Sequence, residues 1–223
     1  MHYYIFEGPD GVGKTTLIQN VTSQLYAQVD GRRLHNYRLP GATTLGQKIR
    51  DIVKPSDPAD MIPIDPITRQ ILMAADYSSY CTLLNRLKHT EAILLVDRCN
   101  EISSRIYLSA DGGDFTALES IYNGLRRPTA NILFALSGDL DSITKRLNSR
   151  SIDYFDNKPK EFQQTIFNLY DSLTGRDVLG LQKMITRTKL ANRIVRIDAT
   201  KEQEEVASDV LSYILDDIAG DQS

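Results

Sequence analysis

The stretch Gly8-Pro9-Asp10-Gly11-Val12-Gly13-Lys14-Thr15 matches the phosphate-binding pattern G-x-x-x-x-G-K-[ST] at every fixed position. Its glycines allow the backbone to curl so that successive N–H groups face one anion. A helix that begins at Lys14 adds the positive end of its dipole. The pattern assigns Lys14 to the β- and γ-phosphates of a nucleotide and the Thr15 hydroxyl to Mg²⁺. The residues expected to hold those phosphates are Gly8, Gly11, Val12, Gly13, Lys14, Thr15 and Thr16.

The segments around this loop have the hydrophobic patterns of alternating strands and helices. Apolar runs at 3–6, 92–96 and 132–136 predict buried strands, and weaker runs at 33–39 and 194–197 predict two more. Helical spacing occurs over 14–25, 45–53, 67–87, 118–125, 142–147, 162–173 and 206–218. This alternation predicts an α/β fold of the P-loop NTPase type, with a doubly wound parallel sheet flanked by helices. No linker divides the chain, so we expect a single domain over 1–223, with a lid at 149–160.

The composition excludes several classes of protein. The 223 residues include 26 basic and 29 acidic ones, for a net charge of −3, which argues against a nucleic-acid partner. The purest apolar run, 92–96, is far shorter than the roughly 20 residues of a membrane span, and no signal peptide is evident. Two cysteines are too few for a disulfide scaffold or a four-cysteine zinc site. We therefore expect a cytoplasmic protein with small-molecule partners and no membrane contact.

An acid and an arginine follow the strand expected at 92–96. Asp97 stands where P-loop proteins often have an acid that helps to hold Mg²⁺. Arg98 would lie at the carboxyl end of the sheet, where it could grip a phosphate with two hydrogen bonds. A structural salt bridge between these two residues is the alternative. The guanine-reading segment Asn-Lys-x-Asp of GTPases does not occur, which leaves a small-molecule kinase as the simplest class.

Several motifs in the right order resemble those of the thymidylate kinase family. Residues 6–16 resemble the family's opening, and residues 38–50 resemble its R-E-P-G-G-T-x-L-G-x-x-I-R. Asp97-Arg98 with residues 103–107 is similar to D-R-Y-x-x-S-S-x-A-Y-Q with one residue inserted, and residues 197–200 resemble the late I-D-A. The resemblance spans nearly the whole chain. It implies phosphorylation of a deoxynucleoside monophosphate, foremost dTMP to dTDP, with ATP and Mg²⁺ as cofactors, in a homodimer.

The resemblance also implies residue roles. Lys14, Arg98, Arg150 and Asp10 would be catalytic, with Arg150 supplying the charge of a lid arginine because Val12 is neutral. Arg146 would lie beside the adenine, while Thr15, Asp97 and Asp10 would lie near the metal. The residues implied to contact the acceptor are Asp10, Arg38, Arg50, Met73, Tyr77, Arg98, Ser103, Ser104 and Tyr107.

One departure from the family concerns the acceptor base. The family's F-x-x-x-R, which stacks on and bonds thymine, is matched by Met73 and Tyr77. Four residues apart on a helix, these two share a face, and we expect them to decide the base. Packing of Tyr77 in the core is the alternative for that residue. For the chain, the alternatives are a kinase for another or modified pyrimidine nucleotide such as dUMP or dCMP, or a catalytically weak nucleotide-binding regulatory protein.

Overall fold

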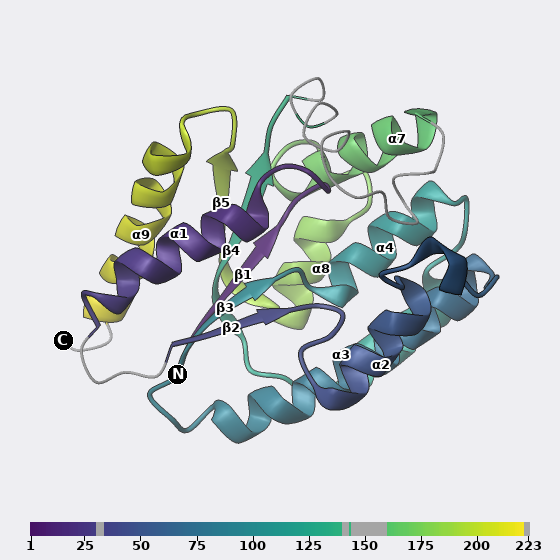
Figure 1. Ribbon diagram of the computed structural model, residues 1–223, viewed down its shortest axis with the longest axis horizontal. Helices are drawn as coiled ribbons and strands as arrows, with labels where there is room; N and C mark the ends of the chain where they lie inside the picture. The colour runs from purple at the N-terminus through teal and green to yellow at the C-terminus, as the bar shows by residue number, and fades with distance from the viewer. Residues whose placement is uncertain (30–33, 140–142, 144–159, 221–223) are drawn as a thin grey trace.

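The framework of the protein is a five-stranded parallel sheet (Figure 1). The computed structural model describes residues 1–29, 34–139, 143 and 160–220. Its strands are β1 (His2–Glu7), β2 (Leu34–Arg38), β3 (Ile93–Asp97), β4 (Ala130–Ser137) and β5 (Ala191–Asp198). They lie in the order β2-β3-β1-β4-β5, and every neighbouring pair is parallel. β1, the strand that leads into the phosphate loop, is therefore at the centre.

Helices cover both faces of this sheet. α1 (Lys14–Tyr26) and α9 (Gln203–Gly220) lie together on one face, on the left in Figure 1. The helices on the other side are α2 (Thr44–Val53), α3 (Pro66–Leu87), α4 (Asn100–Ala110), α5 (Thr116–Gly124), α7 (Lys160–Tyr170) and α8 (Leu181–Thr188). Short 3₁₀ turns occupy Pro58–Asp60 and Asp171–Leu173. In the described part of the chain, no helix is long and apolar enough to span a membrane.

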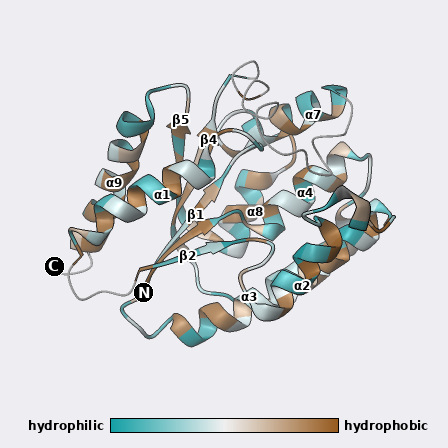
Figure 2. Ribbon diagram, viewed as in Figure 1, coloured by the Kyte–Doolittle hydropathy of each residue, from teal (hydrophilic) through white to brown (hydrophobic). Residues whose placement is uncertain are grey.

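The central strand is apolar on both of its faces. Tyr3 and Ile5 point into the core beneath α3, α4 and α8, whereas Tyr4 and Phe6 point into the core beneath α1 and α9. All four side chains are fully buried, as a parallel sheet covered on both faces requires. Figure 2 shows hydrophobic residues along the inner strands, mainly hydrophilic ones along the edge strand β2, and both kinds on the surrounding helices.

The structure confirms the predicted fold class, and it differs from the sequence-based elements in two helices. α4 was not predicted, because it buries polar as well as apolar side chains and shows no clear apolar stripe. α8 was also missed. Its residues Leu181, Met184 and Ile185 have helical spacing, but eight residues are too few to show a clear helical periodicity in the sequence. The helix expected at 142–147 lies outside the described residues except for Ile143. Residues 149–159 of the predicted lid also lie outside them, whereas Lys160 is the first residue of α7.

The carboxyl ends of three strands meet at one edge of the sheet. Asp97 pairs in register with Phe6 of β1 on one side and with Arg38 of β2 on the other. Residues that follow these strands are therefore brought together although they are about 30 to 90 positions apart in the sequence. In a doubly wound sheet, this is the edge where ligands bind.

Candidate active site

The phosphate loop joins β1 to α1. Gly13 precedes α1 with a φ of 102°, a conformation that favours glycine, and a Cβ at Gly8 would lie 2.7 Å from the carbonyl oxygen of Leu136. Lys14 is buried, and its Nζ donates to the carbonyl oxygens of Gly8 and Pro9 at 2.8 and 2.9 Å. Burial, and to a lesser degree the nearby positive charge of Arg98, lower the pKa of Lys14 to about 8. The loop therefore holds a desolvated cation that an anion would stabilise.

Thr15 and Asp97 form a pair suited to a hard cation. The Thr15 hydroxyl donates to Oδ2 of Asp97 at 3.0 Å. The other carboxylate oxygen, Oδ1, is buried and forms no hydrogen bond within the described residues. A hydroxyl and a carboxylate beside a phosphate loop are the oxygen donors that Mg²⁺ uses together with nucleotide phosphates. The described ranges contain no group of three or more His, Cys, Asp or Glu side chains placed to hold a metal, so phosphate oxygens would have to complete this site.

The Arg98 guanidinium lies directly above the phosphate loop. Its backbone has a φ of 80°, a rare conformation for a residue with a side chain. Nη2 donates to Oδ1 of Asp10 at 2.5 Å, while Nη1 donates to the carbonyl oxygen of Gly8 at 3.2 Å and to the Tyr170 hydroxyl at 2.5 Å. The other oxygen of Asp10 accepts from the Tyr107 hydroxyl at 2.9 Å. Arg98 is thus paired with Asp10 across the loop, which differs from the alternative of a pair with Asp97.

Glu7 ties these parts together, although the sequence analysis did not single it out. Its Oε1 accepts from the backbone N–H of Cys99 at 2.7 Å and from the Ser103 hydroxyl at 2.9 Å. Its Oε2 accepts from the N–H of Gly8 at 3.2 Å and lies 3.5 Å from Nη1 of Arg98. Burial raises the pKa of this carboxyl, and Arg98 opposes that shift. An acid at the last position of an otherwise apolar strand was the available signal.

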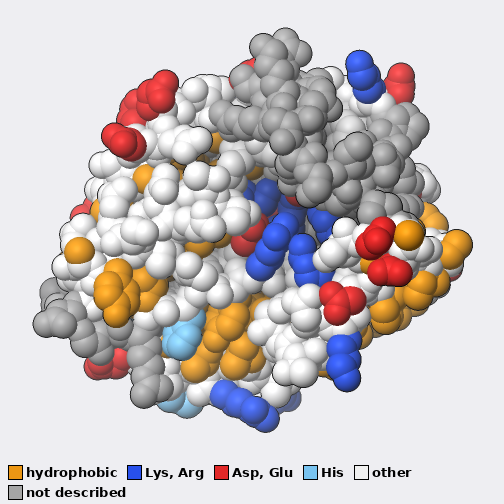
Figure 3. Space-filling view, in the orientation of Figure 1, with side chains coloured by type: hydrophobic (Ala, Val, Ile, Leu, Met, Phe, Trp, Pro, Cys, Tyr) orange, Lys and Arg blue, Asp and Glu red, His pale blue; other side chains and the backbone are white. Residues whose placement is uncertain are grey.

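A cavity opens beside Arg98, between the phosphate loop and α2, α3 and α4. Most of the residues predicted to contact the acceptor line it: Asp10, Arg38, Arg50, Met73, Arg98, Ser103 and Tyr107. Arg38 lies 3.9 Å from Oδ2 of Asp97 and has a half-exposed side chain, while Arg50 donates to the carbonyl oxygen of Pro40 at 3.0 Å. Figure 3 shows Lys and Arg side chains gathered in a hollow at the centre of this face. The cavity is therefore basic at the end nearest the loop.

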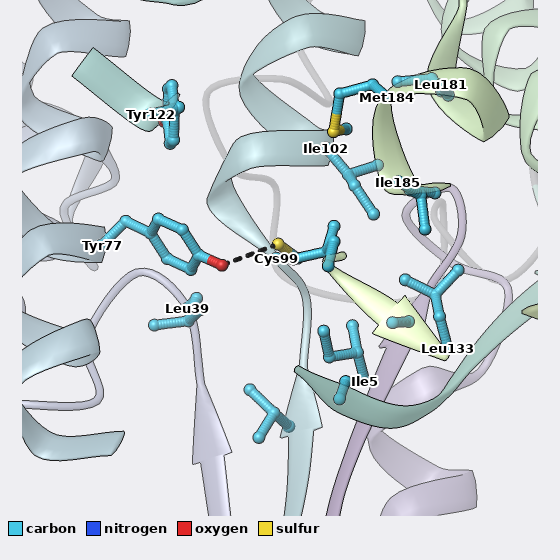
Figure 4. Packing of buried hydrophobic residues seen from close by; sticks show 14 of the residues in the cluster. Ile5, Leu39, Tyr77, Cys99, Ile102, Tyr122, Leu133, Leu181, Met184 and Ile185 are labelled. Carbon is cyan, nitrogen blue, oxygen red and sulfur yellow. Dashed lines mark hydrogen bonds between the residues drawn. The ribbon is translucent and has the colours of Figure 1, made fainter. Parts of the chain in front are cut away.

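Two residues predicted to contact the acceptor do not line this cavity. Tyr77 is fully buried, and its hydroxyl accepts a hydrogen bond from Sγ of Cys99 at 3.5 Å (Figure 4). Ser104 is also fully buried and shares a hydrogen bond of 2.8 Å with the Tyr122 hydroxyl. The expectation that Tyr77 reads the base is therefore corrected, because its neutral ring packs in the core. Arg146 and Arg150 lie outside the described residues.

The cavity also contains two polar side chains that the sequence analysis missed. Arg69 and Gln70 of α3 line it together with Met73, and both are almost fully buried. They lie one helical turn before Met73, so the spacing from that residue could have found them. They place polar groups at the end of the cavity formed by α2 and α3.

Comparison with known proteins places this geometry in a family. Residues 6–210 match the family model for thymidylate kinase. The chain belongs to the thymidylate kinase family. The thymidylate kinase of Pediococcus pentosaceus is 30% identical, over 97% of this chain and 98% of that protein. The thymidylate kinase of Finegoldia magna is 29% identical, over 95% and 97% of the two chains, and that of Malacoplasma penetrans is 27% identical, over 96% and 95%. The predicted family is confirmed.

The burial of Tyr77 gives a test on protein stability. Tyr77→Phe removes one weak contact with a thiol, and we expect it to lower the free energy of unfolding by about 1 kcal/mol or less. Tyr77→Arg, which restores the arginine of the family motif, places a charge in the core and should cost roughly 3 kcal/mol or more. Urea unfolding of both variants measures the difference. An arginine variant as stable as the wild type would show that residue 77 is not committed to the core.

Proposed function

We propose that this thymidylate kinase family member transfers the γ-phosphoryl group of ATP to dTMP, giving dTDP and ADP. The observation that carries the proposal is the convergence of Lys14, Arg38 and Arg98 at one sheet edge, beside a cavity for an acceptor. Such an arrangement suits two phosphate-bearing ligands that meet end to end. Family membership does not favour the alternatives of another pyrimidine acceptor or a catalytically weak binding protein.

The cavity supplies the acceptor side of this reaction. Arg38 and Arg98, with Arg50 nearby, would hold the monophosphate, since guanidinium groups match phosphate oxygens with paired hydrogen bonds. Met73 supplies an apolar surface for the base. Tyr107, whose hydroxyl donates to Asp10, would contact the sugar, as would Ser103.

A second hollow, beside the start of α1, supports a place for the adenosine part of ATP. It is lined by Val12, Gly13, Thr16, Leu17, Leu136, Ala199, Lys201, Gln203 and Val206. These residues come from the phosphate loop, the start of α1, the end of β4, the segment between β5 and α9, and the start of α9. This hollow shares no lining residue with the acceptor cavity, so the donor and acceptor bases would lie apart while their phosphates approach.

The chemistry requires alignment and charge neutralisation rather than a general base. The oxygen that attacks belongs to a monophosphate already largely ionised at neutral pH. Lys14 and Arg98 would therefore act by holding two anions in line and reducing their repulsion. Thr15 and Asp97 would hold a Mg²⁺ ion, which when bound neutralises further phosphate charge. Asp10 near the metal, Arg146 near the adenine and Arg150 as a lid arginine stay predictions, as do the lid, the single domain and the cytoplasmic location.

A homodimer is supported by an exposed face of α3. Between residues 67 and 82, the exposed positions at helical spacing are Ile67, Ile71, Ala75, Ser78 and Thr82, none of them charged, and the exposed Arg86 follows one turn later. Leu45 of the adjoining α2 is 54% exposed, and Ile71 is 48% exposed. Figure 3 shows hydrophobic side chains along the edge where α2 and α3 lie in Figure 1. An uncharged helix face of this kind is suited to packing against a second copy.

The phosphate-loop lysine gives a direct test of the proposed reaction. In a coupled assay, the wild-type protein should release ADP from ATP when dTMP is the acceptor. The rate should be higher with dTMP than with dUMP or dCMP. Lys14→Ala should reduce that rate roughly 100- to 1000-fold, because the cation faces the transferring group. Its fold should persist, since the low pKa of Lys14 shows that burial disfavours this charge. Lys183→Ala, an exposed lysine on α8, is the control, and near-wild-type turnover in Lys14→Ala would contradict the phosphate site.

Arg38 tests the acceptor side. Its side chain is 51% exposed and supports little of the fold, so Arg38→Ala should fold normally. Loss of a charge-assisted contact with phosphate should raise the KM for dTMP roughly 10- to 100-fold and leave the KM for ATP unchanged. Steady-state kinetics with each nucleotide varied in turn provide the measurement, with exposed Arg187→Ala as the control. An equal effect on both nucleotides, or none, would argue against an acceptor role.

The exposed face of α3 tests the oligomeric state. Light scattering after size exclusion should give twice the mass of one chain for the wild type. Ile71→Glu should shift it to one chain mass, because a buried unpaired carboxylate in the interface is strongly unfavourable. Val178→Glu, at a position that is 58% exposed and lies away from α2 and α3, should leave the mass unchanged. A dimer that tolerates Ile71→Glu would place the interface elsewhere.

A further inference from the structure

Gln70 is a buried amide in the acceptor cavity. It is 3% exposed and lines the cavity from α3, and its amide forms no hydrogen bond with any residue in the described ranges. The oxygen and nitrogen of this amide are not among the fully enclosed polar atoms that lack a partner, so they face the cavity that Gln70 lines. A ligand that enters the cavity could therefore form hydrogen bonds with the amide oxygen and nitrogen.

The neighbouring side chains are already engaged or lack suitable groups. The Arg69 guanidinium donates to the carbonyl oxygen of Val53, the last residue of α2, where the helix itself leaves a carbonyl unsatisfied. Met73 offers only a thioether, a weak acceptor. Tyr77, one turn further along α3, is in the core. Gln70 is therefore the neutral side chain at this end of the cavity that can both donate and accept.

The cavity lining also includes the cations Arg50 and Lys54, from α2 and the residue after it, whereas its two hydroxyl groups belong to the other end. The Ser103 hydroxyl donates to Glu7, and the Tyr107 hydroxyl donates to Asp10. Both pairs surround Arg98 above the phosphate loop, where the acceptor's phosphate and sugar would lie. An acceptor oriented with its phosphate at Arg98 would direct its base toward Gln70 and Met73.

We propose that Gln70 reads the polar edge of the acceptor base, in place of residue 77. The proposal rests on the proposed function, because thymine presents an N–H donor at N3 beside the O4 acceptor. The carbonyl oxygen and the NH₂ group of one amide complement that pair with two hydrogen bonds. Met73, three residues further along the same helix face, supplies the apolar surface beside it. Gln70 is thus a specificity-determining residue that stands about two helical turns before the position of the family's arginine.

Two substitutions at one position separate reading of the base from shaping of the cavity. Gln70→Leu keeps the volume and removes both hydrogen bonds, so kcat/KM for dTMP should fall at least tenfold while the KM for ATP changes less than twofold. Its melting temperature should change little, because the amide faces the cavity and no hydrogen bond to it supports the fold. Gln70→Glu can only accept, which suits the N4 amino group of cytosine and repels O4 of thymine. The ratio of kcat/KM for dCMP to that for dTMP should therefore rise roughly tenfold or more.

Gln24→Leu, the same substitution at an exposed position of α1, is the control and should match the wild type in all measurements. Calorimetric affinities for dTMP and dCMP without ATP are measured on the same proteins. If the wild type does not turn over dTMP, the proposed function fails. The affinities for dTMP and dCMP still test whether Gln70 contacts the base. An unchanged Gln70→Leu variant, or a Gln70→Glu variant that loses both nucleotides equally, would overturn the proposal.

Discussion

The buried carboxylate of Glu7 is the interaction on which the site depends. A carboxylate removed from water must be matched by hydrogen-bond donors or by a positive charge, and Glu7 has both. Its partners are the N–H of Gly8 in the phosphate loop, the N–H of Cys99 after β3, the Ser103 hydroxyl of α4 and the guanidinium of Arg98. One side chain thus holds the phosphate loop against the segment after β3 and against α4. A shift of either part would leave a charge buried without its partners.

Arg98 links the buried Glu7 to the phosphate loop. Its guanidinium is held by Asp10, the carbonyl oxygen of Gly8 and the Tyr170 hydroxyl. Because these contacts come from both sides of the loop and from α7, the cation is oriented before any ligand binds. A charge that is already oriented needs no reorganisation when phosphate charge develops beside it. The left-handed backbone at Arg98 directs the side chain over the loop. The strained backbone therefore lies at the same residue as the pre-oriented cation.

The sequence allowed the sheet and the phosphate site to be predicted because both depend on local patterns. Each of these signals can be interpreted without knowing the tertiary contacts: an unbroken apolar run, a glycine loop, and Asp97 at the end of a strand. α4 could not be found in this way, because it is enclosed on all sides and uses Glu101, Ser103 and Ser104 as buried polar groups. Its polar residues are satisfied by distant partners, such as Arg127 for Glu101 and Glu7 for Ser103. Those partners are known only once the chain is folded.

The acceptor cavity shows why a shared helix face did not suffice to place a side chain. Met73 and Tyr77 lie four residues apart on α3, yet the cavity extends only along the turn from Arg69 to Met73. Beyond Met73 the same face meets the core, where a tyrosine ring can be buried between Tyr80 and Tyr122 but a guanidinium would need a counter-charge. Replacing arginine by tyrosine therefore closes that end of the site. A base in the cavity would meet α3 at the preceding turn, where the amide of Gln70 lines the cavity.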